Sequence, residues 1–151
     1  EEAGLHFEIG VIKNRYVGRT FLQPTHAGRK MAVSIKLNPV VEVLQGKRVA
    51  VVDDSIVRGT TSGKLIALLR EAGAREVHMY VASPPYRFSC FYGIEPSSSN
   101  ELVARGRTLK ELRDLIKADS LHYVSVEGLV RAIGMRKNQL CLACFTGEYP
   151  I

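Results

Sequence analysis

One stretch decides how this chain folds: residues 47–62 read KRVAVVDDSIVRGTTS. Val49–Val52 is a short apolar run rich in β-branched residues, which predicts a parallel strand buried on both faces. Polar residues begin where this run ends, and apolar residues then recur with helical spacing from Leu65 to Ala72. The stretch therefore predicts a strand, a loop and a helix in direct succession.

The loop between this strand and helix has the composition of an anion site. Gly59 permits a close or left-handed backbone, and Thr60, Thr61 and Ser62 offer hydroxyls and helix-capping oxygens. The free amide groups and positive dipole end of the following helix favour a phosphate. Because open α/β folds bind ligands at the carboxyl edge of the sheet, we expect a phosphate here.

Two neighbouring carboxylates, Asp53 and Asp54, precede the loop and do not suit a phosphate. They suit hydroxyls or a divalent cation, and consecutive residues at a strand end point in different directions. One can therefore face a sugar diol while the other reaches the water shell of Mg²⁺. Taken alone, the pair is more typical of an acidic turn before an ordinary helix cap. Together with the strand, loop and helix, it favours a ribose 5-phosphate ligand.

The remaining sequence alternates strand and helix patterns. The expected strands are residues 6–12, 77–81 and 121–124, and the expected helices are residues 109–116 and 126–133. Residues 15–38 lack a stable period and carry many cations, which predicts a mobile functional loop. The alternation predicts an α/β fold with a parallel sheet and flanking helices.

The composition and charge of the chain argue against some classes of protein. The 151 residues, 46% hydrophobic and 24% charged, suit one globular domain. No apolar stretch approaches the ~18 residues of a transmembrane helix, so we expect no membrane partner. The net charge is +6, but the cations are spread without interleaved aromatic residues, which argues against a nucleic-acid partner. Because the chain begins with Glu1 and not with methionine, we expect a piece of a longer protein.

Three cysteines have metal-ligand chemistry. Cys141 and Cys144 form a C-x-x-C pair, and Cys90 stands alone upstream. Three is a poor number for a disulfide scaffold. Two thiolates within one turn and a third could hold zinc or an iron–sulfur cluster, whereas a redox pair or inert buried thiols fit as well. The residues alone leave these alternatives open.

Several stretches resemble one known family. Residues 52–61, VDDSIVRGTT, resemble the phosphoribosyl pyrophosphate (PRPP) motif of type I phosphoribosyltransferases, in the form found in amidophosphoribosyltransferases. Residues 13–21 resemble the segment leading into that family's flexible catalytic loop, and residues 125–129 and 141–147 resemble its distal part. The resemblance implies a type I phosphoribosyltransferase fold, incomplete at its N-terminus. Residues 1–151 would form the C-terminal part of that domain, without the N-terminal glutamine-hydrolysing domain.

The resemblance also implies a reaction and the residues that perform it. The family transfers the phosphoribosyl group of PRPP to glutamine-derived ammonia, giving 5-phosphoribosylamine in the first step of purine synthesis. Asp53 and Asp54 would bind the ribose diol and Mg²⁺. The residues expected around the 5-phosphate are Ser55, Arg58, Gly59, Thr60, Thr61 and Ser62. The residues expected to close over pyrophosphate as catalytic groups, and to help form the ammonia path, are Lys13, Arg15, Tyr16 and Arg19.

The family's other attributes follow as expectations. One class carries a four-iron four-sulfur (4Fe-4S) cluster, which would place Cys90, Cys141 and Cys144 on the cluster with the fourth ligand upstream of this chain. We therefore expect these three cysteines to converge. Ammonia would come from the missing N-terminal domain, purine nucleotides would act as feedback ligands, and the full-length protein would be a cytoplasmic homo-oligomer. The fragment alone is expected to be inactive.

Two other functions compete with this one. A salvage phosphoribosyltransferase acting on a free nucleobase would need neither the C-x-x-C pair nor the segment at residues 13–21. A non-catalytic regulator could keep the fold as a ligand sensor and bind DNA, but it would add a helix-turn-helix ahead of the fold.

Overall fold

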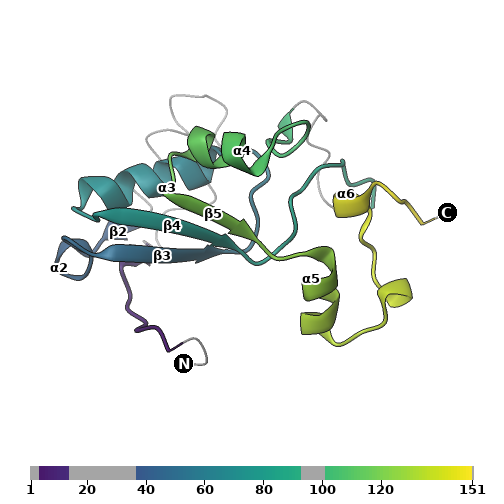
Figure 1. Ribbon diagram of the computed structural model, residues 1–151, viewed down its shortest axis with the longest axis horizontal. Coiled ribbons are helices and arrows are strands. Elements are labelled where there is room, and N and C mark those ends of the chain that lie inside the picture. The colour runs from purple at the N-terminus through teal and green to yellow at the C-terminus, as the bar shows by residue number, and fades with distance from the viewer. Residues whose placement is uncertain (1–3, 14–36, 93–100, 151) are drawn as a thin grey trace.

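The computed structural model describes residues 4–13, 37–92 and 101–150. The elements in chain order are β1 (Val11–Lys13), β2 (Leu37–Pro39), α2 (Val41–Leu44), β3 (Arg48–Asp53), α3 (Thr60–Glu71), β4 (Glu76–Val81), α4 (Leu109–Ile116), β5 (Ser120–Tyr123), α5 (Val126–Ile133), the 3₁₀ turn η3 (Lys137–Gln139) and α6 (Ala143–Thr146) (Figure 1). Within these ranges no helix is both long enough and apolar enough to cross a membrane.

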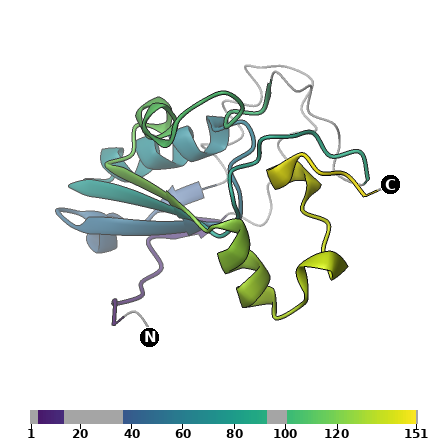
Figure 2. The same cartoon turned by 45° about the vertical axis from the view of Figure 1, so that its right-hand side comes forward.

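The centre of the fold is a three-stranded parallel sheet in the order β3-β4-β5. Asp53 pairs in register with Val81, and Val81 with Tyr123, so the three strands end together at one edge. Helices α3 and α4 connect the strands and lie side by side on one face of the sheet (Figures 1 and 2). The predicted α/β fold with a parallel sheet is confirmed, and the elements at residues 48–133 match the expected ones closely.

The hydrophobic core lies between this sheet and the two helices. Its fully buried side chains include Ile66 and Leu69 of α3, Val77 and Met79 of β4, and Ile116 of α4. Alternating residues of β4 supply the sheet side of the core, because successive side chains of a strand point to opposite faces. Burial of these aliphatic groups holds α3, and with it the loop ahead of α3, against the sheet.

In the described part of the chain the opposite face of the sheet is open, which corrects one expectation. Residues of β3 alternate between exposed and partly buried, and Val52 is 74% exposed. Tyr80 of β4 is 43% exposed on the neighbouring strand. The prediction that Val49–Val52 is buried on both faces was wrong for the described chain, because α3 and α4 cover the same face.

The N-terminal part of the chain differs from the sequence expectation in two places. A strand was expected over residues 6–12, but β1 covers only Val11–Lys13 and pairs antiparallel with β2. Leu37 and Asn38 were assigned to a loop and instead belong to β2. Both strands are three residues long and depend on each other for hydrogen bonds, so neither has a strong local signal. The rest of the expected mobile loop, residues 14–36, lies outside the described residues.

Candidate functional site

The two predicted carboxylates lie at the carboxyl edge of the sheet. Asp53 is the last residue of β3 and is half-buried, whereas Asp54 is exposed. The backbone N–H of Asp54 donates to Oδ1 of Asp53 at 3.0 Å, and the Ser55 hydroxyl donates to Oδ1 of Asp54 at 3.2 Å. These bonds orient the turn and leave carboxylate oxygens to accept hydroxyls or to ligate a hard cation.

The electrostatics of this turn favour a cation or a hydrogen-bond donor beside it. Burial raises the pKa of the Asp53 carboxyl, the backbone N–H of Asp54 lowers it, and the nearby charge of Asp54 raises it. The net shift is upward, so the ionised form of Asp53 is less favourable here than in water. A divalent cation or sugar hydroxyls would offset this cost.

Gly59 is required where it stands, immediately before α3. Its φ is +74°, in the left-handed region that favours glycine. An added Cβ would lie 3.2 Å from Cγ2 of Val103 and 3.3 Å from Cδ2 of Leu115. The backbone conformation and the available space therefore both require glycine at this position. The start of α3 lies close to residue 103 and to the end of α4.

The first turn of α3 has the features expected of an anion site. Gly59 is its N-cap residue and provides no side-chain hydrogen bond, and the turn contains no acidic residue. The backbone N–H groups of this turn therefore have no capping oxygen from a side chain. Thr60 and Thr61 are exposed, whereas Ser62 is only 2% exposed. Backbone amides and the two threonine hydroxyls are thus the groups that can reach a phosphate.

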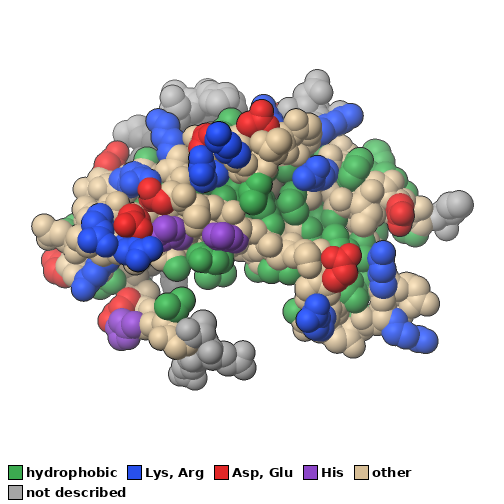
Figure 3. Space-filling view, in the orientation of Figure 1, with side chains coloured by type: hydrophobic (Ala, Val, Ile, Leu, Met, Phe, Trp, Pro, Cys, Tyr) green, Lys and Arg blue, Asp and Glu red, His purple; other side chains and the backbone are tan. Residues whose placement is uncertain are grey.

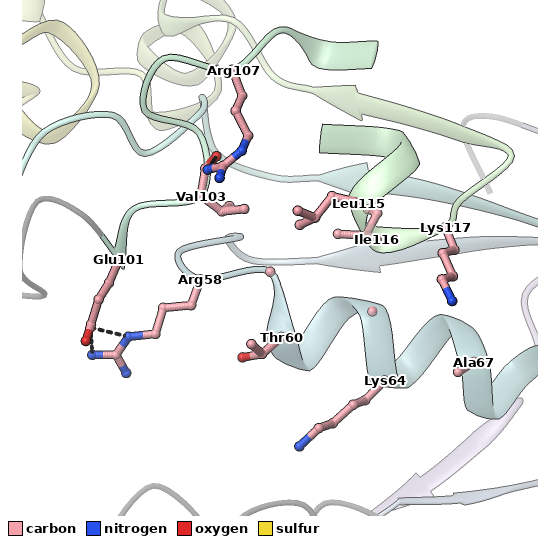
Figure 4. Close-up of a pocket in the computed structure, with 12 residues that line it drawn as sticks. Arg58, Thr60, Lys64, Ala67, Glu101, Val103, Arg107, Leu115, Ile116 and Lys117 are labelled. Atoms are coloured by element: carbon pink, nitrogen blue, oxygen red, sulfur yellow. Dashed lines mark hydrogen bonds and ion pairs between the residues drawn. The ribbon is translucent and has the colours of Figure 1, made fainter. Parts of the chain in front are cut away.

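The surroundings of the Arg58 side chain differ from those expected of a residue that binds phosphate. Its guanidinium forms an ion pair with Glu101 at 2.7 Å, at the end of a groove on the α3 side of the loop (Figure 4). The loop is also attached to residue 103, whose N–H donates to the Val57 carbonyl at 2.8 Å. Arg58 would contact a phosphate only after releasing Glu101.

Of the expected catalytic residues, only Lys13 is described. It is exposed and ends β1, which pairs with β2 and not with the strand that carries the carboxylates. Arg15, Tyr16 and Arg19 lie outside the described residues, so their expected role stays a prediction.

The three cysteines are brought into one region by the C-terminal tail. The carbonyl oxygen of Cys144 accepts from the N–H groups of Arg87 and Phe88, at 3.0 and 3.1 Å, three and two residues before Cys90. The Tyr149 hydroxyl donates to the Ser89 carbonyl at 2.6 Å and strengthens the same junction. Figure 2 shows α6 beside this segment. The tail therefore returns to the segment that carries Cys90, as the sequence predicted.

The chemistry of this region suits a thiophilic metal, although its present geometry is open. The pKa of the Cys144 thiol is raised, mainly by burial and further by the charges of Cys90 and Cys141. None of the three cysteines forms a disulfide bond in the described part of the chain. In the ranges described, no three His, Cys, Asp or Glu side chains are arranged closely enough to hold a metal ion. Three soft thiolates are an apt donor set for an iron–sulfur cluster or zinc, but closing the site would require side-chain movement.

Two further polar groups at the carboxyl edge were missed by sequence reasoning. The hydroxyls of Ser83, just after β4, and of Tyr123, the last residue of β5, are buried without a hydrogen-bond partner in the described part of the chain. Burial raises the pKa of Tyr123 to about 12. Their only signal in the sequence is their position at the ends of parallel strands.

Comparison with known proteins gives consistent relatives along the whole chain. This chain is 53% identical over 150 residues to amidophosphoribosyltransferase 2, chloroplastic, of Arabidopsis thaliana. The match covers 99% of this chain and 27% of the relative. It is also 53% identical to the amidophosphoribosyltransferase of Bacillus subtilis, covering 99% and 32%, and 51% identical to that of Methanocaldococcus jannaschii, covering 99% and 31%. The chain thus spans about a third or less of the length of these relatives. No family model matches it.

Comparison with solved structures gives relatives of the same kind. The solved structure of glutamine PRPP amidotransferase from B. subtilis, complexed with ADP and GMP, superposes with a TM-score of 0.84 and 53% identity. It covers 98% of this chain and 33% of the solved one. A structure described as the allosteric regulatory enzyme of purine biosynthesis gives a TM-score of 0.83 at the same identity.

Proposed function

The chain is homologous over its whole length to a segment of the amidophosphoribosyltransferases, and on that premise we propose that it carries their phosphoribosyl-binding site. The reaction would transfer the phosphoribosyl group of PRPP to ammonia derived from glutamine, giving 5-phosphoribosylamine for purine synthesis. The observation that carries the proposal is the position of the two aspartates at one sheet edge, seven and six residues before the first turn of α3, which has no side-chain cap.

The geometry supports binding and charge placement more than acid–base chemistry. The first turn of α3 would hold the 5-phosphate through backbone amides, and Asp53 and Asp54 would accept hydrogen bonds from the ribose hydroxyls. Holding both ends of the sugar phosphate fixes the anomeric carbon for attack. Mg²⁺, which the same carboxylates would help to hold, would neutralise the charge of the departing pyrophosphate.

A second proposal concerns the cysteines, which we assign to a four-iron four-sulfur cluster. The thiols lie around one junction between the C-terminal tail and residues 86–90, and a cluster there would cross-link the tail to the domain. A fourth ligand would have to come from outside the described residues. Anaerobic reconstitution with iron and sulfide should give brown absorbance with the two elements in near-equal amounts, and Cys141→Ser should lose both. Stoichiometric zinc without sulfide would contradict the assignment.

The partners of the reaction belong to the same proposal. The B. subtilis enzyme was solved with ADP and GMP, which supports purine nucleotides as regulatory ligands of this protein as well. We further propose that ammonia reaches the site from a glutamine-hydrolysing domain, and that the complete protein is a homo-oligomer. We also propose a cytoplasmic location for the complete protein, as the family resemblance implies.

The test of the main proposal is binding by the chain itself. Calorimetry with PRPP and Mg²⁺, and separately with ribose 5-phosphate, should show one site in the unchanged chain. Asp54→Ala should weaken binding of both ligands by about tenfold or more, because hydrogen bonds to charged groups contribute roughly 1.5 to 3 kcal/mol. Asp114→Ala is the matched control, since Asp114 is an exposed aspartate of α4 paired with Arg113 and remote in sequence from the loop.

Two outcomes would decide against the proposal. Equal affinity in the Asp53→Ala, Asp54→Ala and Asp114→Ala variants would remove the carboxylates from the site. A chain that binds PRPP and consumes it only when a free nucleobase is supplied would favour the salvage function instead.

A further inference from the structure

An ion pair beside the proposed phosphate site joins two segments that are far apart in the chain. The Nε and a terminal nitrogen of Arg58 both contact the Glu101 carboxylate, at 2.8 and 2.7 Å. Arg58 immediately precedes Gly59, the N-cap residue of α3. Figure 4 shows the pair at the end of the groove nearest Thr60. The pair therefore lies next to the backbone amides assigned to the 5-phosphate.

The segment that carries Glu101 is fixed against the phosphate loop. Residues 102–104 follow it directly and are each at most 5% exposed. The N–H of Val103 donates to the carbonyl of Val57, the residue before Arg58, at 2.8 Å. Because buried neighbours and a backbone hydrogen bond hold this segment, the Glu101 carboxylate stays within reach of the Arg58 guanidinium.

The contact between the two side chains is of a kind that a phosphate can displace. Both nitrogens of Arg58 contact the same oxygen, Oε2 of Glu101, and the two side chains are 53% and 49% exposed. Exposed ion pairs of this kind are weak. A phosphate carries more negative charge than a carboxylate and can offer one oxygen to each of two guanidinium nitrogens. At the start of α3 it would also accept from backbone amides that receive no side-chain cap from Gly59.

We propose that Glu101 is a positioning residue that sets the phosphate affinity of the loop through Arg58. Before a ligand binds, its carboxylate holds the guanidinium to one side of the first turn of α3. A bound 5-phosphate replaces this carboxylate as the partner of Arg58. The affinity for phosphate is therefore reduced in proportion to the fraction of molecules in which the ion pair is formed. This inference rests on the proposed function, which places the 5-phosphate at this turn.

Calorimetry on the whole chain with ribose 5-phosphate and Mg²⁺ tests the sign of the effect. Glu101→Gln keeps the size of the side chain and removes its charge, so the affinity should rise about two- to sixfold, as expected for release of an exposed ion pair. Arg58→Ala should weaken binding by about tenfold or more. In the double variant, the Glu101 substitution should have no further effect, because its partner is gone. A purely structural role of Glu101 would instead lower the affinity.

Glu76→Gln is the matched control. The Glu76 carboxylate forms an ion pair of the same length, 2.7 Å, with Arg48. Arg48 begins β3, at the opposite end of the strand from Asp53. This substitution therefore removes a comparable glutamate charge at a distance from the phosphate loop, and the affinity for ribose 5-phosphate should not change.

The nitrogen NMR resonance of Arg58 Nε reports the ion pair directly. It should shift in Glu101→Gln without ligand, and in the unchanged chain when ribose 5-phosphate is added. Lower or unchanged affinity in Glu101→Gln, or an equal gain in Glu76→Gln, would overturn the role of Glu101 and leave the phosphoribosyl site in place. An Arg58 resonance that Glu101→Gln does not move would overturn the ion pair itself. Failure of ribose 5-phosphate to bind in every variant would overturn the phosphoribosyl site, and the role of Glu101 with it.

Discussion

Two regions of the molecule are assembled in opposite ways. The phosphate loop is residues 53–62, and the cysteine region is Cys90 with the C-terminal tail from Cys141 to Tyr149. The loop follows β3 and precedes α3 without interruption, so its carboxylates and amides come from ten consecutive residues. The cysteine region joins Cys90 to a tail more than fifty residues away through backbone hydrogen bonds to the Cys144 carbonyl. A local site forms with its supporting strand and helix, whereas the distant one forms only if the tail docks. The two regions should therefore respond independently to substitution.

Gly59→Ala should have the largest effect and should separate the two regions most clearly. The alanine Cβ meets Val103 and Leu115 at a left-handed position, so we expect a loss of about 2 to 4 kcal/mol in the free energy of unfolding and loss of ribose 5-phosphate binding. Urea unfolding and calorimetry measure the two effects.

Gly106→Ala is the matched control for this substitution. Gly106 has φ +68° with no atom within 4 Å of an added Cβ, so only the conformational cost of about 1 to 2 kcal/mol applies. The difference between the two variants isolates the steric contact at the loop. Equal losses in both would mean that the close approach of Val103 and Leu115 does not constrain the loop.

Tyr149→Phe should act on the cysteine region alone. It removes the hydrogen bond to the Ser89 carbonyl, which should cost about 0.5 to 1.5 kcal/mol in docking of the tail. Amide exchange should accelerate at residues 143–149, with ribose 5-phosphate affinity unchanged. Tyr80→Phe is the control, because Tyr80 is 43% exposed on the open sheet face. A fall in phosphate-loop affinity would show that the two regions are coupled.

The pH dependence of stability should carry opposite signs at two aspartates. Burial raises the folded-state pKa of Asp53, so its contribution to stability is full below its unfolded pKa and is lost as pH rises through the folded pKa. The pKa of Asp119 is lowered, chiefly by the hydrogen bond from the Val77 N–H. Its contribution is present above its unfolded pKa and is lost as pH falls through the folded pKa.

Asparagine variants test this difference by urea unfolding between pH 3 and pH 7. At pH 7, Asp53→Asn should stabilise the chain and Asp119→Asn should destabilise it. This result would mean that the ionised Asp53 carboxylate, which suits a ligand, lowers the free energy of unfolding of the chain. Destabilisation by Asp53→Asn at pH 7 would contradict that view.

Val52→Ala should have the smallest effect, although Val52 belongs to the strand that leads into the loop. Its side chain is 74% exposed, so we expect a change within about 0.5 kcal/mol. Val77→Ala, on the core side of the neighbouring strand, should cost roughly 1 to 3 kcal/mol because Val77 is completely buried. A large loss from Val52→Ala would show that the open face is covered in solution.

Sequence reasoning succeeded where the determinants were local. The apolar run before Asp53, the glycine ahead of α3 and the spacing of Ile66 and Leu69 are each read from neighbouring residues. The return of the C-terminal tail to the segment that carries Cys90 was anticipated from the family resemblance. Reasoning from local pattern failed for β2 and for the open sheet face, because strand pairing and burial depend on what lies across the molecule.

By itself the sequence determined the order of strands and helices, the carboxylate pair and the phosphate loop, since these follow from periodicity and from the chemistry of adjacent side chains. Only the tertiary structure decided that α3 and α4 share one face, that Arg58 pairs with Glu101, and that Lys64 and Lys117 line one groove. Each of these depends on contacts between residues more than forty positions apart. Such contacts arise from packing of whole elements, which no local pattern encodes.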